Sequence, residues 1–179
     1  MKFWWQKEKI LGVKWLVEPD IDTRQIQDGD ENIIITDKTG KRTTLLKDKI
    51  KYPFISKVPC SLLIQTTVKD IQIDIEKDYV YNGSDIPAGV EFFVGSKEDI
   101  RFLKGALPHD YVLEHKEKFK PIFWENISNA EYRRLTSLMY RESIKDTGTG
   151  TIKANIMSWF VDVFQATVNR KAWCMKWVY

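Results

Sequence analysis

The chain has 179 residues, of which 43% are hydrophobic and 30% charged, the balance of an ordinary globular domain. Its formal net charge is only +3, spread along the chain, so we predict no nucleic-acid partner, because such partners are usually bound by basic residues gathered on one face. No run approaches the roughly 20 apolar residues that cross a bilayer, and residues 1–9 lack the apolar core of a signal peptide, so we predict neither a transmembrane segment nor a secretion signal.

The first half of the chain has the pattern of β-strands. Turn residues separate apolar or β-branched runs at residues 10–17, 33–36, 42–46 and 61–68. Between Ile71 and Ile75, isoleucines alternate with polar residues, which is the period of a half-buried strand. A further short strand is predicted at residues 90–94, ending at a glycine.

The period then becomes helical. Ser96 and Asp99 resemble a capping box, and we expect the helix that they start to end at Gly105. Pro108 suits the first turn of the next helix, where its missing N–H costs nothing, and this second helix carries His109.

Two more helices are predicted in the last third of the chain. Ser128 and Glu131 form a capping box, with Ile127 and Tyr132 placed as a hydrophobic staple. The turn at residues 146–151 ends that helix. The apolar face of a final amphipathic helix is marked by Ile152, Ile156, Trp159, Phe160, Val163 and Thr167. The chain is therefore predicted to be α+β, a strand-rich N-terminal part packed on a C-terminal cluster of about four helices.

Aromatic residues are frequent, with seven Trp, seven Tyr and nine Phe, and such rings are enriched in contact patches. The last seven residues are too apolar for a solvated tail, and we expect them to dock on the body or on a neighbouring chain. The predicted interface residues are Trp4, Trp5, Trp173, Trp177 and Tyr179. Cys60 and Cys174 have no metal-ligand spacing and are expected to be reduced, packed thiols, with a disulfide between them as the alternative.

One stretch combines a glycine turn with a histidine that enters a helix. The turn supplies candidate binding residues at Asn82, Gly83, Ser84 and Asp85. His109 could serve as a general base toward water or a hydroxyl, and the carboxylate of Asp110 could hold a cation such as calcium.

Adjacent helical residues point about 100° apart, so we expect His109 and Asp110 to act separately rather than as one dyad. The competing interpretation is structural: Asp110 favours the positive helix N-terminus, and His109 is a satisfied core residue. Glu131 is the candidate carboxylate that orients His109, although its capping role needs no catalysis. Asp146-Thr147-Gly148 spells an aspartic-protease triplet, but its place between two helices favours a helix end and linker.

These residues resemble an uncharacterised family of phage and prophage proteins, in which an Asp-Gly-Ala-Ser-Ile-Pro turn precedes an Ala-x-x-His-Asp-x-x-Tyr helix. The matching segments are residues 82–87, 106–110 and 130–132, and the resemblance covers roughly residues 70–165. The family's pattern is in turn similar to secretory phospholipases. By that resemblance His109 would be the base, Asp110 a possible calcium ligand and Glu131 the orienting carboxylate.

Three positions depart from the family pattern. Leu113 replaces the motif tyrosine, Asn82 replaces an aspartate, and Ala88-Gly89 follow the turn where a basic residue is usual. A chain with these changes can keep the fold and lose the activity. We divide it into a strand-rich extension at residues 1–59, a family core at residues 60–170 and an apolar tail at residues 171–179.

We predict a non-enzymatic virion-associated or assembly protein of a phage, located in the virion or the host cytoplasm. The resemblance implies the phage context, and the non-enzymatic role follows from the departures from the motif, the apolar C-terminus, the added N-terminal strands and the lack of a secretion signal. The expected partners of the chain are other virion proteins or further copies of itself, and it needs no cofactor. The alternative is a His/Asp-dependent hydrolase, phospholipase-like or acting on the cell envelope during entry or lysis, for which calcium is a possible cofactor.

Overall fold

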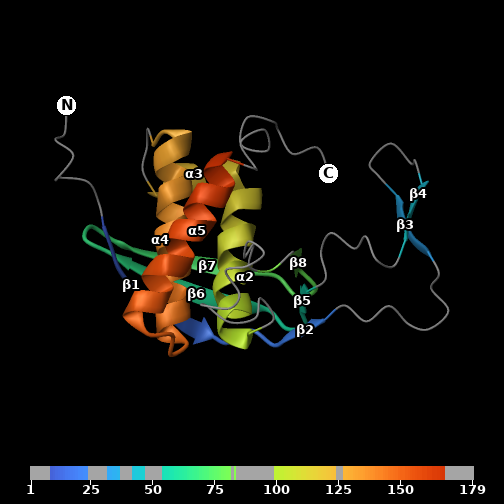
Figure 1. Ribbon diagram of the computed structural model, residues 1–179, viewed down its shortest axis with the longest axis horizontal. Coiled ribbons are helices and arrows are strands. Elements are labelled where there is room, and N and C mark those ends of the chain that lie inside the picture. Colours follow the sequence, from blue (N-terminus) through green and yellow to red (C-terminus); the bar gives the residue numbers. More distant parts are fainter. Residues whose placement is uncertain are drawn as a thin grey trace.

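A computed structural model describes residues 9–23, 32–36, 42–46, 54–81, 83, 99–123 and 127–167 of the chain. Within these ranges the strands occupy the N-terminal half and the helices the C-terminal half (Figure 1). The predicted α+β class is therefore confirmed.

The described strands form three antiparallel sheets. One sheet has the strand order β1-β6-β7, a second has the order β2-β5-β8, and β3 pairs with β4 in a hairpin. The strands are β1 (Ile10–Val17), β2 (Ile21–Thr23), β3 (Asn32–Thr36), β4 (Arg42–Leu46), β5 (Phe54–Ser56), β6 (Cys60–Thr66), β7 (Asp70–Ile75) and β8 (Val80–Tyr81). The strand expected at residues 90–94 lies outside the described residues.

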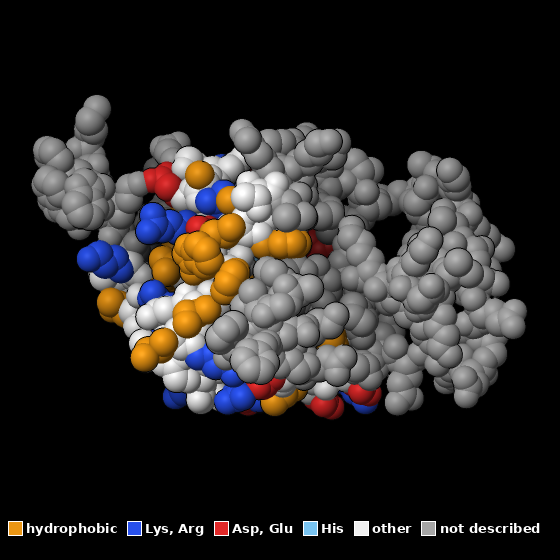
Figure 2. Space-filling model, in the orientation of Figure 1, with side chains coloured by type: hydrophobic (Ala, Val, Ile, Leu, Met, Phe, Trp, Pro, Cys, Tyr) orange, Lys and Arg blue, Asp and Glu red, His pale blue; other side chains and the backbone are white. Residues whose placement is uncertain are grey.

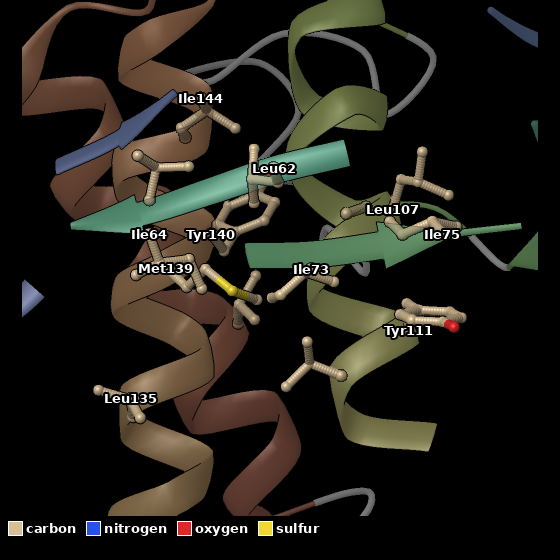
Figure 3. Close-up of a cluster of buried hydrophobic side chains, with 14 of the residues drawn as sticks. Leu62, Ile64, Ile73, Ile75, Leu107, Tyr111, Leu135, Met139, Tyr140 and Ile144 are labelled. Carbon is tan, nitrogen blue, oxygen red and sulfur yellow. The ribbon is translucent and has the colours of Figure 1, made fainter. Parts of the chain in front are cut away.

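The β1-β6-β7 sheet buries one face. Every second residue of β7 is buried, as the alternation of isoleucines predicts. Leu62 of β6 pairs with Ile73 of β7, and both side chains are completely buried. Figure 3 shows these side chains extending toward Met139 and Tyr140, which are also buried and come from a helix. The core therefore lies between this sheet and the helices.

The helices of the described part are α2 (Ile100–Glu114), α3 (Lys116–Phe123), α4 (Asn129–Asp146) and α5 (Thr151–Thr167). Both α2 and α5 pack on α4, and α4 also contacts β1 (Figure 1). Among the helices described, none is both long and apolar enough to cross a bilayer.

The predicted helix end at Gly105 is wrong, because α2 continues through Gly105 and Pro108. A Cβ built on Gly105 would lie 2.3 Å from Cγ2 of Ile144 in α4, so this glycine allows close contact between two helices. Pro108 lies inside α2 rather than in its first turn and cannot donate the backbone hydrogen bond to Lys104. Burial of both residues against the core explains why the helix tolerates them.

The N-terminus of α4 has the predicted capping box. The backbone N–H of Glu131 donates to Oγ of Ser128 at 3.2 Å, and the backbone N–H of Ser128 donates to Oε2 of Glu131 at 3.2 Å. The staple residues Ile127 and Tyr132 are both buried. Helix α4 ends at Asp146, which agrees with the interpretation of the Asp-Thr-Gly triplet as a helix end.

Some of the N-terminal strands belong to the same sheets as later strands. Strand β1 pairs with β6, and β2 pairs with β5. A sheet therefore joins residues from both sides of the boundary that we placed at residue 59.

Candidate functional site

Helix α2 carries the candidate base. Its N-cap is Asp99, whose side chain accepts a hydrogen bond from the backbone N–H of Arg101 at 3.0 Å. An uninterrupted series of buried residues follows from Gly105 to His109, so this part of α2 faces the core. His109 is consequently fixed by a helix that is packed on α4, rather than by a loop.

His109 and Asp110 form a close pair, contrary to the expectation that they act separately. Nδ1 of His109 lies 2.9 Å from Oδ1 of Asp110. With an ionised carboxylate and a neutral imidazole, Nδ1 would be the donor in this contact and Nε2 would be left as an acceptor. Rotation of the side chains about their own bonds overcomes the 100° between neighbouring positions on the helix.

The pair is closed to solvent on the histidine side. The His109 side chain is 4% exposed and that of Asp110 is 18% exposed. Nε2 of His109 is buried and has no hydrogen-bond partner among the described residues. The ring packs edge-on against Tyr140, with the ring centroids 6.0 Å apart. The imidazole is therefore paired with a carboxylate, as a general base usually is, but it lies in the core.

Glu131 is placed elsewhere. Besides its backbone contacts with Ser128, its Oε2 accepts a hydrogen bond from the Ser128 hydroxyl at 2.8 Å. This capping box stands at the start of α4, whereas the ring of His109 packs on Tyr140, nine residues or about 13 Å further along that helix. Asp110, not Glu131, is the carboxylate that contacts the imidazole.

The described part of the glycine turn lies against α2. Gly83 has φ of +80°, and a Cβ at this position would lie 2.6 Å from Cε2 of Phe54 and 3.2 Å from Cδ2 of Leu103. Only glycine fits this backbone conformation and this contact. The other candidate binding residues, Asn82, Ser84 and Asp85, lie outside the described residues, as do the predicted interface residues Trp4, Trp5, Trp173, Trp177 and Tyr179.

Tyr81 lies close to the carboxylate of Asp110. Its hydroxyl donates to the backbone carbonyl of Leu103 at 3.2 Å. Burial, and secondarily the negative charge of Asp110, raise the pKa of Tyr81 far above its ordinary value. Burial also raises the pKa of the Cys60 thiol to about 11, so this free cysteine is a packed thiol as predicted. Cys174 lies outside the described residues.

Asp110 is the proposed metal ligand. Among the described residues, no group of three His, Cys, Asp or Glu side chains is arranged to hold a metal ion. Asp110 instead has its Oδ1 2.9 Å from Nδ1 of the His109 imidazole.

A group of polar and aromatic side chains that was not predicted lies at the C-terminal end of α2. The Tyr79 and Tyr111 rings pack edge to face with centroids 5.0 Å apart, and His115 lies over Tyr111 at 4.3 Å. The Tyr111 hydroxyl donates to Oε2 of Glu76 at 2.7 Å, and the Tyr79 hydroxyl donates to Glu114. These contacts tie the end of β7 to α2. The i, i+4 spacing of Tyr111 and His115 was the available signal.

Helix α5 differs most from its prediction. Five of the six residues assigned to its apolar face are exposed, and only Phe160 is partly buried. The four exposed residues with large apolar side chains, Ile152, Ile156, Trp159 and Val163, are called the α5 stripe. The side packed on α4 is made of Ala154, Met157, Ser158, Val161 and Gln165. The Ser158 hydroxyl donates to the backbone carbonyl of Ser137 in α4 at 2.7 Å, which fixes this contact between the helices.

Comparisons with known proteins give no family assignment. No protein-family model, no curated protein and no solved structure matches the chain.

Proposed function

We propose that the chain is a non-enzymatic component of a phage particle or of its assembly, and that it acts by contact with neighbouring proteins. The observation that carries this proposal is the burial of His109. A general base must come within hydrogen-bond distance of the proton that it removes, or reach it through one water. The Nε2 atom that would do so is buried in the core.

The contact role is supported by what the chain exposes. The α5 stripe presents large apolar side chains to solvent from Ile152 to Val163 of one helix, a feature that typically marks a protein-binding surface. The phage context is supported by the resemblance of residues 70–165 to a phage family. The closed histidine also fits the three departures from that family's motif.

The proposal is tested in particles of the phage or prophage that encodes the chain. Quantitative mass spectrometry of gradient-purified particles and of assembly intermediates should find the chain at a fixed ratio to the major coat protein. A cytosolic host enzyme from the same lysate serves as the control for carry-over. Absence of the chain from both fractions would overturn the proposal.

The second candidate is a hydrolase with His109 as base and Asp110 as the carboxylate that orients it. The specific observation in its favour is the 2.9 Å contact at Nδ1 combined with the lone pair at Nε2 that no described residue uses. Catalysis would require water to reach that atom.

A turnover assay separates the two candidates. The purified chain is incubated with short-chain phospholipids and with cell-wall fragments, each with and without calcium. A hydrolase predicts turnover that His109→Ala abolishes and His115→Ala retains. The non-enzymatic proposal predicts no turnover by any of the three proteins.

A further inference from the structure

The α5 stripe is too exposed and too apolar for a solvated helix face. The exposed fractions are 78% for Ile152, 42% for Ile156, 59% for Trp159 and 36% for Val163. Figure 2 shows hydrophobic side chains following α5 across this face of the molecule. A surface helix normally carries charged residues on the side away from the core, whereas the only charges in α5 are Lys153 and Asp162.

The α5 stripe is not the side of α5 that packs on the core. The opposite side of α5 is already buried against α4. Within the described part of the chain, α5 therefore has two apolar sides, and only one of them has a partner. The second side requires a partner that lies outside this packing.

The spacing of the stripe matches a second copy of itself. Its four residues are separated by four, three and four positions, which is the seam spacing of helices that pack in a left-handed pair. This spacing reads the same in both directions. If two copies of α5 cross antiparallel about a two-fold axis, Ile152 lies opposite Val163 of the second copy, and Ile156 lies opposite Trp159 of the second copy.

We propose that the α5 stripe is a self-association surface, which pairs two copies of this chain through antiparallel α5 helices. Each large Trp159 then fills the space beside the smaller Ile156. A parallel pair would set Trp159 against Trp159 and align the two helix dipoles unfavourably. The inference deepens the contact function proposed above, since it names a surface and a partner.

The charges of α5 permit this pairing. Lys153 already lies 4.9 Å from the ring centroid of Phe102, and Asp162 accepts a hydrogen bond from Nε of Arg133 at 3.0 Å. In the antiparallel pair Lys153 and its copy are nine residues apart along the helices, about 13 Å, so like charges do not meet. No charge in α5 loses its partner when the stripe is covered.

The size of the surface sets the expected strength. The four side chains expose a patch on the order of 400 Å², in the range of the largest patch on a typical monomer. Two such patches bury about 800 Å² of apolar surface, less than the 1,200–2,000 Å² of a standard stable interface. The dimer should therefore be reversible and depend on concentration in the micromolar range.

The test uses the purified full-length chain in sedimentation equilibrium across a hundredfold range of concentration. The chain should shift from monomer to dimer, and Trp159→Glu or Ile152→Lys should raise the dissociation constant at least about tenfold. Ile152→Lys is the safer change for the fold, because that side chain is the most exposed of the stripe. Val68→Glu is the matched control, since Val68 is 74% exposed but lies in the turn between β6 and β7, and it should leave the dimer unchanged.

A second measurement tests the antiparallel register. When the single variants Ile156→Cys and Trp159→Cys are mixed, mild oxidation should join one chain of each kind, because residue 156 of one copy faces residue 159 of the other. A parallel pair would instead join two chains of the same variant. A chain that stays monomeric over the whole concentration range overturns the inference. The α5 stripe would then be covered by residues 168–179 or by another protein instead of a second copy. A dimer that Val68→Glu disrupts and Ile152→Lys does not would also overturn it.

The outcomes separate this inference from the proposed function. If the chain is found in particles but stays monomeric, the proposed function is supported and the α5 pair is refuted. If the chain is dimeric but is absent from particles and from assembly intermediates, the α5 pair is supported and the proposed function is refuted.

Discussion

Replacement of Gly105 by alanine tests the contact between α2 and α4, on which the position of His109 depends. The new Cβ would lie 2.3 Å from Cγ2 of Ile144 and 3.2 Å from ring atoms of Tyr140. In an open helix the same change would stabilise the chain by about 1 kcal/mol through helix propensity. Here Ile144 is completely buried and β-branched, so its Cγ2 has little freedom to move away.

The expected change in the free energy of unfolding is the sum of the gain in helix propensity and the loss from overpacking. Overpacking of a closed contact costs about 1–3 kcal/mol, and a separation of 2.3 Å belongs at the upper end of that range. After the gain in propensity, we expect Gly105→Ala to lower the free energy of unfolding by about 1–2 kcal/mol. Denaturant titration followed by circular dichroism measures this change.

Two further variants show whether the loss comes from the helix contact. Gly150→Ala places its Cβ where no heavy atom lies within 4 Å, so it should change stability by less than about 0.5 kcal/mol. Ile144→Leu removes the Cγ2 branch at constant volume, so the double variant with Gly105→Ala should be less destabilised than the two single effects added together. Strict additivity, or a stabilising Gly105→Ala, would refute the close contact.

Three other predictions concern caps and buried groups. Ser128→Ala should lower the free energy of unfolding by about 1 kcal/mol in denaturant titration, because it removes the side chain that the backbone N–H of Glu131 needs; an unchanged midpoint would contradict the capping box. The hydrogen bond from Arg101 holds the pKa of Asp99 below its ordinary value of 3.8, so the stability due to this cap should be present above that pH and lost as the pH falls below it; Asp99→Asn should weaken this acid dependence in thermal melts. Burial raises the pKa of Cys60 to about 11, so folding favours the neutral thiol. The contribution of this thiol to the stability of the fold should be complete below pH 9.0 and should be lost as the pH rises toward 11. Rapid alkylation of Cys60 in the folded chain at pH 8, measured by mass spectrometry, would contradict its burial.

The strands were predictable because their signal is local. The alternation from Ile71 to Ile75 depends only on which face of a strand is buried, and β7 buries that face. The capping box of Ser128 and Glu131 is also local, since its partners are three residues apart. Such patterns do not require knowledge of the neighbouring elements.

The incorrect predictions concern residues whose role depends on contacts with distant parts of the chain. Gly105 carries the signal of a helix end, but the approach of Ile144, 39 residues later, gives it a packing role instead. In α5 the large side chains suggested the buried face, whereas the smaller Ala154 and Ser158 line the close contact with α4. The His109–Asp110 contact depends on side-chain rotation, which helix geometry alone does not give.

The candidate base His109 is buried in the core, and the two histidines of the chain allow a direct test of this burial. Diethyl pyrocarbonate modifies accessible imidazoles, and mass spectrometry of peptides measures the rate at each position. His115 is partly exposed and serves as the internal reference, whereas His109 is 3% exposed. The closed site predicts that His115 is modified in the folded chain and that His109 reacts only after denaturation. Modification of both histidines at similar rates in the folded chain would contradict the account.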